Sequence, residues 1–232
     1  MSEFEDYAPN GLQVQGRPQI RRLVSGVSAS LALVQRAIAL DADAILVHHG
    51  WFWRGEDVRV VGQKHQRLRA LLRADINLFA VHLPLDAHPE LGNNAQLAAH
   101  LGWDVGGRFG KQGLGMLGSA PQATLGELAD AIEVGLGRRP LLVGDPQSAV
   151  GPLAWCSGAA QSWIDQAHAA GATTYVSGEI SEPTAHFARE MGINYLACGH
   201  HASERYGVRA LGRHLARQWD LEHHFIDLDN PA

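Results

Sequence analysis

Histidines and acidic residues follow three apolar runs of this sequence. The runs are AILVHHG at 44–50, FAVHLPLD at 79–86 and ACGHHASE at 197–204. Each begins as an apolar segment typical of a buried strand and ends in histidine with an acid nearby. Ligand sites of open α/β folds collect at the carboxyl ends of strands, so we expect these side chains at the rim of a sheet. Imidazole nitrogens and carboxylate oxygens bind transition-metal ions, and their number and mixed charge favour two ions over one.

The spacing of the candidate ligands indicates how they would share two ions. His48 and His49 are adjacent, and on a regular strand they would point to opposite faces. If the strand ends at Gly50, both can bind metal, most naturally each to a different ion. His200 and Glu204 are four residues apart. A helix that starts just after His200, at about residue 202, would let both side chains reach one point.

Two carboxylates are candidates to bridge the ions. Asp86 follows Pro84, which ends a strand and turns the chain at the rim. Glu204 is the second candidate, since a carboxylate has two oxygens. These ligand types accept Zn, Fe, Mn, Co or Ni, so two divalent transition-metal ions per chain are expected without a fixed identity. If only one motif were present, the simpler interpretation would be surface histidine pairs and a hydrogen-bonded core His82. Because three motifs occur at three predicted strand ends, we favour metal binding.

Other residues have both a catalytic and a structural interpretation. His82 is expected as a proton-transfer residue or a support for a ligand rather than a ligand itself. Glu56 is a candidate general base, or a plain surface acid. The run Trp51–Trp53 would form a stacking wall for a purine, or a packing or subunit contact. Cys156 is expected to be a buried strand residue rather than a nucleophile.

Apolar periodicity predicts an α/β fold with largely parallel sheets flanked by helices, because predicted strands and helices alternate. Ser28 or Ser30 is the expected cap of the first helix, Asn93 and Thr124 are expected caps of later ones, and Gly102 a stop. The glycine-rich stretch 106–118 is expected to mark a change of lobe or an exposed crossing. The strands are expected at 20–30, 42–50, 76–86, 139–145, 151–158, 172–179, 193–201 and 221–229, and the helices at 31–40, 63–74, 93–102, 123–136, 161–171, 182–192 and 202–218.

An internal echo suggests two related lobes. INLFAVHLPLD and INYLACGHHASE both start with Ile-Asn, continue as an apolar strand, and place His four residues before an acid. Each is preceded by a predicted helix and, before it, a predicted strand. We therefore expect a first lobe over 1–108 and a second over 109–232, each with half of the site.

Composition narrows the class of protein. The 232 residues are 46% hydrophobic and 19% charged, as in an ordinary globular protein. A formal net charge of −5 argues against a nucleic-acid partner held by non-specific attraction and against an anionic membrane surface. Three acids among the first ten residues are not typical of a signal peptide, and no apolar stretch approaches a membrane span of about 20 residues. Two cysteines in apolar contexts are typical of a reduced, cytoplasmic protein.

Five longer segments carry a resemblance to a known family. They are DYAPNGLQVQG at 6–16, VHHGWFWRGE at 47–56, HLPLDAHPELGNNAQLA at 82–98, SGEISE at 177–182 and GHHASERYGVRAL at 199–211. In this order, over nearly the whole chain, they resemble the Nif-three-like dinuclear-metal family, often named GTP cyclohydrolase 1 type 2, and its short bacterial branch. The family usually has a helix before the first segment, where this sequence has five residues.

The resemblance implies a function and a set of ligands. By resemblance, His49 and Asp86 hold one ion, His48 and His200 hold the other, and Glu204 bridges them. It also implies a two-lobed α/β fold, a ring-shaped homohexamer with its sites on an interior cavity, and places Glu179 near the site. The expected activity is metal-dependent hydrolysis of a small, nucleotide-like substrate, with His82 or Glu56 moving the proton. The alternative is a non-enzymatic metal-binding ring that binds a protein or nucleic-acid partner.

Overall fold

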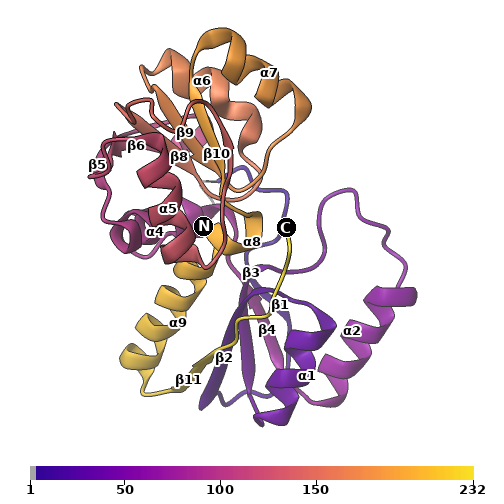
Figure 1. Cartoon of the computed structure of the whole chain (residues 1–232). Helices are drawn as coiled ribbons and strands as arrows, with labels where there is room; N and C mark the ends of the chain where they lie inside the picture. The colour runs from indigo at the N-terminus through magenta and orange to yellow at the C-terminus, as the bar shows by residue number, and fades with distance from the viewer. Residues whose placement is uncertain (1–3) are drawn as a thin grey trace. The chain divides into compact units, whose positions relative to one another are not determined.

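The computed structural model describes residues 4–232, which form two compact units (Figure 1). The first unit contains the chain up to Leu85 and the segment Val208–Asp229. The second contains Asp86–Gly207 and Asn230–Ala232. The sequence suggested one division, at residue 108. The chain instead returns to the first unit near its end, because its last strand, Glu222–Phe225, pairs there with the strand Arg22–Ser28.

The first unit is built on a mostly parallel sheet. In the described part of the chain its strand order is β1-β4-β3-β2-β11, in which β1 is antiparallel to β4 and the other pairs are parallel. Its helices α1 and α2 connect β2 to β3 and β3 to β4. The elements are β1 (Gly11–Val14), β2 (Arg22–Ser28), α1 (Leu31–Ala39), β3 (Ala44–His49), α2 (Gly62–Arg73), β4 (Asn77–Ala80) and β11 (Glu222–Phe225).

The second unit is built on a mixed sheet. Among the described residues its strand order is β5-β6-β8-β9-β10-β7, and only the pairs β8–β9 and β9–β10 are parallel. The expectation of largely parallel pairing therefore holds for the first sheet and for the centre of the second. The elements are α4 (Asn93–Leu101), β5 (Asp104–Phe109), η1 (Lys111–Gly113), β6 (Gly115–Ser119), α5 (Leu125–Leu136), β7 (Leu141–Val143), β8 (Leu153–Cys156), η2 (Gln161–Trp163), α6 (Ile164–Ala169), β9 (Thr174–Ser177), α7 (Glu182–Met191), β10 (Asn194–Ala197) and α8 (His200–Ser203).

Two helical elements stand where the chain passes from one unit to the other. The short helix α3 (Leu83–Asp86) has its last residue in the second unit. The long helix α9 (Arg205–Trp219) starts in the second unit and continues in the first from Val208. Among the described residues, none of the helices combines the length and the apolar character needed to cross a membrane.

Helix boundaries follow from local side chains in most cases. Ser30 caps α1 by accepting a hydrogen bond from the Leu33 amide, and Thr124 forms a capping box with Glu127 at the start of α5. Gly102 ends α4 in the left-handed conformation, as predicted. The prediction for Asn93 was wrong: Gly92 is the N-cap residue, and the Asn93 side chain is buried in the unit.

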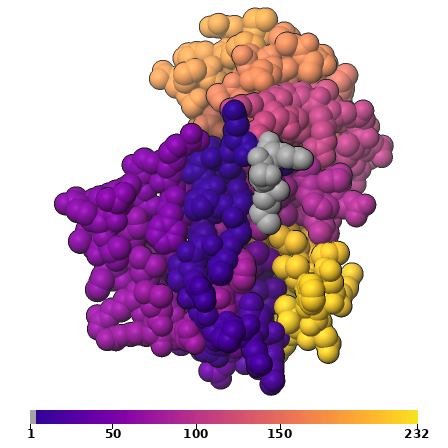
Figure 2. All heavy atoms as spheres, turned by 180° about the vertical axis from the view of Figure 1, so that it is seen from behind, coloured from indigo at the N-terminus to yellow at the C-terminus, as the bar shows by residue number. Residues whose placement is uncertain are grey.

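The glycine-rich stretch is a hairpin inside the second unit and does not separate two lobes. The strands β5 and β6 pair antiparallel across η1, from Asp104 opposite Ser119 to Phe109 opposite Gly115. A side chain at Gly115 would collide with the Phe109 ring, so glycine is needed for this close approach. The edge strand β1 was also not predicted; it belongs to the N-terminal segment, whose surface is indigo in Figure 2.

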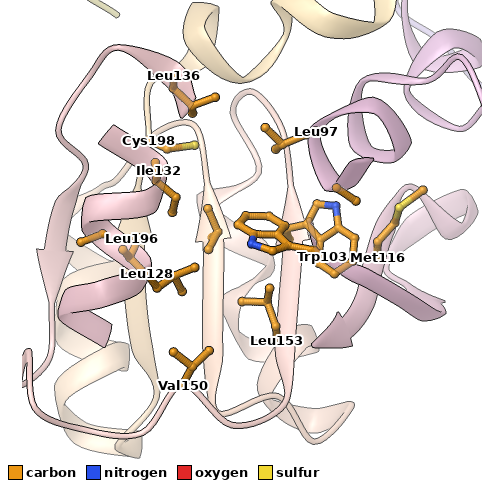
Figure 3. Packing of buried hydrophobic residues seen from close by; sticks show 14 of the residues in the cluster. Leu97, Trp103, Met116, Leu128, Ile132, Leu136, Val150, Leu153, Leu196 and Cys198 are labelled. Carbon is orange, nitrogen blue, oxygen red and sulfur yellow. The ribbon is translucent and has the colours of Figure 1, made fainter. Parts of the chain in front are cut away.

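Each unit has its own apolar core. In the second unit, Trp103 and Trp155 meet edge to face with ring centroids 5.3 Å apart, and leucine and isoleucine side chains from α4, α5 and the sheet surround them (Figure 3). In the first unit, α1 packs Leu33, Val34 and Ala37 against the strands. Burial of this kind supplies most of the stability that holds the strand ends in place.

Candidate metal centre

Three histidines gather at the strand ends of the first unit. His48 and His49 are the last two residues of β3, and His82 follows β4, its parallel neighbour. One ring nitrogen of each lies within 4.8 Å of the others. His48 is fully buried and His82 is 6% exposed. The first unit therefore presents a compact set of imidazole nitrogens, two from the predicted ligands His48 and His49 and one from His82.

Hydrogen bonds determine which nitrogen most of these rings present. Nδ1 of His48 lies 3.0 Å from the Val81 carbonyl oxygen, and Nδ1 of His82 lies 2.8 Å from Oδ1 of Asp6. A carbonyl and a carboxylate only accept, so both rings carry a proton on Nδ1 and, when neutral, present the lone pair of Nε2. Nδ1 of His49 lies 3.1 Å from the Ser28 hydroxyl, which can donate or accept.

The second unit contributes a histidine between two carboxylates. His200 starts the short helix α8, two residues earlier than predicted, and Glu204 follows its end. Nδ1 of His200 lies 2.6 Å from Oε1 of Glu179, and Nε2 lies 3.2 Å from Oε2 of Glu204. Glu179 thus fixes the ring and directs Nε2 toward Glu204. The Oε2 atom of Glu179 also accepts a hydrogen bond from Gln161.

The two carboxylates change the acidity of the histidine. Burial of the His200 ring lowers its pKa, but the hydrogen bonds and negative charges of Glu204 and Glu179 outweigh burial and raise the pKa to about 9. The environment of this ring therefore favours positive charge.

Asp86 adds a further buried carboxylate to the second unit. It is 7% exposed, Glu204 is 3% exposed, and an oxygen of one lies within 4.8 Å of an oxygen of the other. The Asn93 amide donates a hydrogen bond of 2.8 Å to Oδ1 of Asp86, and the same side chain accepts from the Gly207 amide. Two buried carboxylates at this separation repel each other, and a cation would offset that repulsion.

The donors of the second unit fit a transition-metal ion. Ligand atoms about 2.0–2.2 Å from one ion stand roughly 3–3.5 Å apart at tetrahedral or octahedral angles. The 3.2 Å between His200 Nε2 and Glu204 Oε2 agrees with this. Two glycines keep the space clear: a Cβ at Gly158 would collide with Oε1 of Glu204, and one at Gly178 would lie 2.8 Å from the His200 Cα.

The remaining predicted residues lie in different environments. Glu56 is in an exposed loop, where Oε2 accepts a hydrogen bond from the Trp53 amide and lies 3.7 Å from the Lys64 ammonium. Trp51 is buried, and its ring nitrogen donates to the Ala29 carbonyl. The Phe52 ring lies under the Lys64 ammonium, which leaves Trp53 as the aromatic residue of the run beside His82. A continuous stacking wall of all three rings is therefore wrong.

Cys156 is a buried strand residue, as expected. Burial raises the pKa of its thiol, and the negative charges of Asp86 and Glu204 raise it further. A thiol in this environment stays protonated and is a poor nucleophile. Burial likewise raises the pKa of Cys198 to about 12.

Sequence reasoning did not find three of the residues that support the donors. Asp6, Ser28 and Asn93 bond to His82, His49 and Asp86 respectively. Asp6 lies in the DYAPNG segment that carried part of the resemblance, but its partner is 76 residues away and no local pattern marks it.

The whole chain matches one family. A model of Duf34/NIF3 (NGG1p interacting factor 3) matches residues 1–231. This chain belongs to the Duf34/NIF3 family. Among similar proteins is the GTP cyclohydrolase 1 type 2 homolog of Pseudomonas aeruginosa, 53% identical over 235 residues that cover 100% of this chain and 93% of the relative.

Solved structures agree with this membership. One, the structural-genomics protein ybgI, described as of unknown function, is 51% identical, has a TM-score of 0.95 and covers 100% of this chain and 94% of its own. Another, TTHA1606 from Thermus thermophilus, is 32% identical with a TM-score of 0.86, over 98% of this chain and 92% of its own. The predicted α/β fold of the Duf34/NIF3 family is confirmed.

Proposed function

We propose that this Duf34/NIF3 protein is a metal-dependent hydrolase with a dinuclear centre and a small, nucleotide-like substrate. The proposed ligands are His48, His49, Asp86, His200 and Glu204. The observation that carries the proposal is the chemistry of the two donor sets: imidazoles whose Nδ1 atoms are held by hydrogen bonds, of which His48 is fully buried, and the buried carboxylates of Asp86 and Glu204, which lie close to one another. Two divalent ions would supply Lewis acidity, which makes water more acidic and offsets negative charge that develops on a substrate.

The protein's own side chains have distinct tasks in this proposal. His82 moves a proton, because its Nδ1 atom is held by Asp6 and its Nε2 lone pair is left for a substrate or a water. Glu179 and Asn93 orient His200 and Asp86. Glu56 holds the loop that carries Trp53, so we assign the proton transfer to His82 alone.

The substrate class is proposed from similarity to relatives. Several relatives, including that of Escherichia coli K12, which is 52% identical over 231 residues, are named GTP cyclohydrolase 1 type 2 homolog. Ring opening of GTP is therefore the first reaction to test. Fold alone does not determine substrate, so the screen should include other nucleotides.

Metal content tests the first half of the proposal. Purified protein supplied with Zn, Mn and Fe should contain about two ions per chain by elemental analysis, as two metal sites require. His48→Ala and Glu204→Ala should each lower this number. His65→Ala, on the exposed face of α2, should leave it unchanged. Wild-type protein without metal after this supply would end the proposal.

Turnover tests the second half. Hydrolysis of GTP or another nucleotide should disappear on chelation and fall at least about a hundredfold in Asp86→Ala, the scale on which changes beside metal ligands act. Activity that persists in metal-free Asp86→Ala would point to a contaminant. Fully metallated protein with no turnover across the screen would favour a role in binding a protein or nucleic-acid partner.

We also propose that the chain assembles with copies of itself into a six-membered ring. An exposed apolar segment supports an interface between copies: Val58, Val60 and Val61 are 88%, 49% and 59% exposed. Light scattering should return a mass six times 25.1 kDa. A monomer at micromolar concentration would rule out this assembly.

A further inference from the structure

The imidazole of His82 differs from that of His48 in the group that accepts the hydrogen bond from Nδ1. His48 bonds through Nδ1 to a backbone carbonyl, whereas His82 bonds to a carboxylate, Asp6. The side chains of His82 and Asp6 are 8% and 4% exposed. A buried carboxylate that accepts from Nδ1 of a histidine both fixes the tautomer and stabilises the protonated ring. This pair is therefore built for proton transfer at Nε2.

Asp6 is bound so that only a carboxylate satisfies its surroundings. Its Oδ1 accepts hydrogen bonds from the Ala8 backbone amide at 3.1 Å and from Nδ1 of His82. Its Oδ2 accepts hydrogen bonds from the Asn10 side-chain amide at 2.9 Å and from the Leu83 backbone amide at 3.0 Å. Both oxygens face donors only. An asparagine in this place would turn its own NH2 group toward one of these pairs.

The acceptor role of Asp6 agrees with its charge. Burial raises the pKa of its carboxyl, but the hydrogen bonds from Asn10, His82 and Ala8 outweigh burial and hold the pKa below its ordinary value. Asp6 is therefore ionised at neutral pH, and the proton between the two side chains belongs to Nδ1 of His82.

The rest of the N-terminal segment fixes the plane of the ring. Asn10 accepts a hydrogen bond of 2.7 Å from the His82 backbone amide. The rings of Tyr7 and Trp53 meet His82 edge to face, with centroids 5.2 and 5.0 Å away. Tyr7 is 50% exposed, whereas His82 is 6% exposed, so the ring that meets His82 on this side is itself in contact with solvent.

We propose that Asp6 is a positioning residue that keeps the proton of neutral His82 on Nδ1, so that Nε2 accepts a proton from the substrate or from the attacking water. The proton then resides on the imidazolium, whose charge Asp6 offsets, and is returned from Nε2 to the leaving group. The role in turnover rests on the hydrolase proposed above; the assignment of the tautomer does not.

Kinetics with GTP tests the role in turnover. Asp6→Asn should lower kcat about a hundredfold or more, the scale of general acid–base catalysis, with KM and metal content nearly unchanged. In a His82→Ala background the same change should alter kcat less than about twofold, because Asp6 acts through His82. Asp57→Asn, a surface carboxylate paired with Arg59, is the matched control and should behave as wild type. Loss of metal in Asp6→Asn, or an effect additive with His82→Ala, would overturn the proposal.

Nuclear magnetic resonance tests the tautomer without any turnover. In metal-free protein labelled with ¹⁵N-histidine, the His82 signals, identified by their absence in His82→Ala, should show the proton on Nδ1 at alkaline pH. In Asp6→Asn they should show a mixture of tautomers or the proton on Nε2. If no nucleotide in the screen is hydrolysed, the hydrolase proposal fails while this measurement still decides whether Asp6 fixes the ring. A proton on Nε2 in the wild type would overturn the assignment.

Discussion

Four strands of each unit share one order and direction but carry different side chains at their ends. In the first, β2, β3 and β4 run parallel, and the preceding strand β1 pairs antiparallel with β4. In the second, β8, β9 and β10 run parallel, and the preceding strand β7 pairs antiparallel with β10. The two Ile-Asn segments supply strands at the same place in this order, β4 in the first unit and β10 in the second.

Strand register allows the units to be compared position by position. In the first sheet Gly26 pairs with Val47 and Val47 with Ala80; in the second, Cys156 pairs with Ser177 and Ser177 with Ala197. The residues that follow in each strand therefore occupy equivalent places at the rim.

The equivalent places carry opposite chemistry. His49 in the first unit corresponds to Glu179 in the second, and Ser28, which bonds to His49, corresponds to Gly158, which leaves space for Glu204. The first rim thus presents imidazole nitrogens, whereas the second presents one imidazole together with the carboxylates of Glu179, Asp86 and Glu204. The fold determines where ligands can stand, and the side chains at those places determine the charge they offer.

Substitution of Gly158 should give the largest effect on metal affinity of the changes that test this comparison. Gly158 and Gly192 have almost the same backbone conformation, φ +67° and +69°, but a Cβ would collide with Glu204 at Gly158 and would meet nothing within 4 Å at Gly192. Alanine at either position should cost about 1–2 kcal/mol in the free energy of unfolding, from the left-handed backbone. Only Gly158→Ala should also lose metal affinity, by about a hundredfold or more, measured by competition with a chelator. Equal affinities in the two variants would contradict the role given to Gly158.

Local pattern was enough to locate much of the fold and of the candidate ligands. The apolar runs before His48 and His200 form strands, as their local residue pattern predicted. Ser30 and Thr124 cap their helices by accepting hydrogen bonds from amides three residues later. The strand β5 was missed because its sequence, DVGGRF, has no apolar alternation and depends on pairing with β6.

Long-range contacts were not predictable in the same way. The strand β11 returns to β2, about 200 residues earlier, so the division into units is not visible as a break in composition. Asp6 finds His82 across 76 residues, and nothing near Asp6 in the sequence indicates that partner. The support that Asp6 gives His82 therefore emerges only from the three-dimensional arrangement.

The supporting partners of the two rims should differ in strength. Glu179→Gln removes a charged partner of His200 and should lower metal affinity about 10- to 100-fold. Ser28→Ala removes a neutral partner of His49 at 3.1 Å, worth about 0.5–1.5 kcal/mol, or roughly two- to tenfold in affinity. Chelator competition on both variants measures the difference. The reverse order would show that the charge of Glu179 is not what distinguishes the rims.

Residues at the strand ends away from the candidate ligands should give the smallest effect, and it is an effect on stability. Asp43 and Thr173 occupy equivalent positions, and the backbone carbonyl of each accepts a hydrogen bond from the first residue of the neighbouring strand, Asn77 or Asn194. The side chains differ: the Asp43 carboxylate accepts from the Arg21 and Arg22 amides at 2.8 and 2.9 Å, whereas the Thr173 hydroxyl donates to a carbonyl.

This difference predicts that the contribution of Asp43 to stability depends on pH and that the contribution of Thr173 does not. Burial of the Asp43 carboxyl raises its pKa, but the amides of Arg22 and Arg21 and the Arg17 guanidinium outweigh burial and hold the pKa below its ordinary value. A carboxyl with a lowered pKa in the folded state contributes stability that is present above its unfolded pKa and lost as pH falls through its folded pKa. Asp43→Asn should therefore cost about 1 kcal/mol at pH 7 and progressively less as the pH falls below the unfolded pKa, whereas Thr173→Ala should cost a similar amount at every pH. Urea unfolding at pH 7, 5 and 3 measures both, and a loss in Asp43→Asn that stays constant down to pH 3 would show that the charge of Asp43 does not stabilise this end of the sheet.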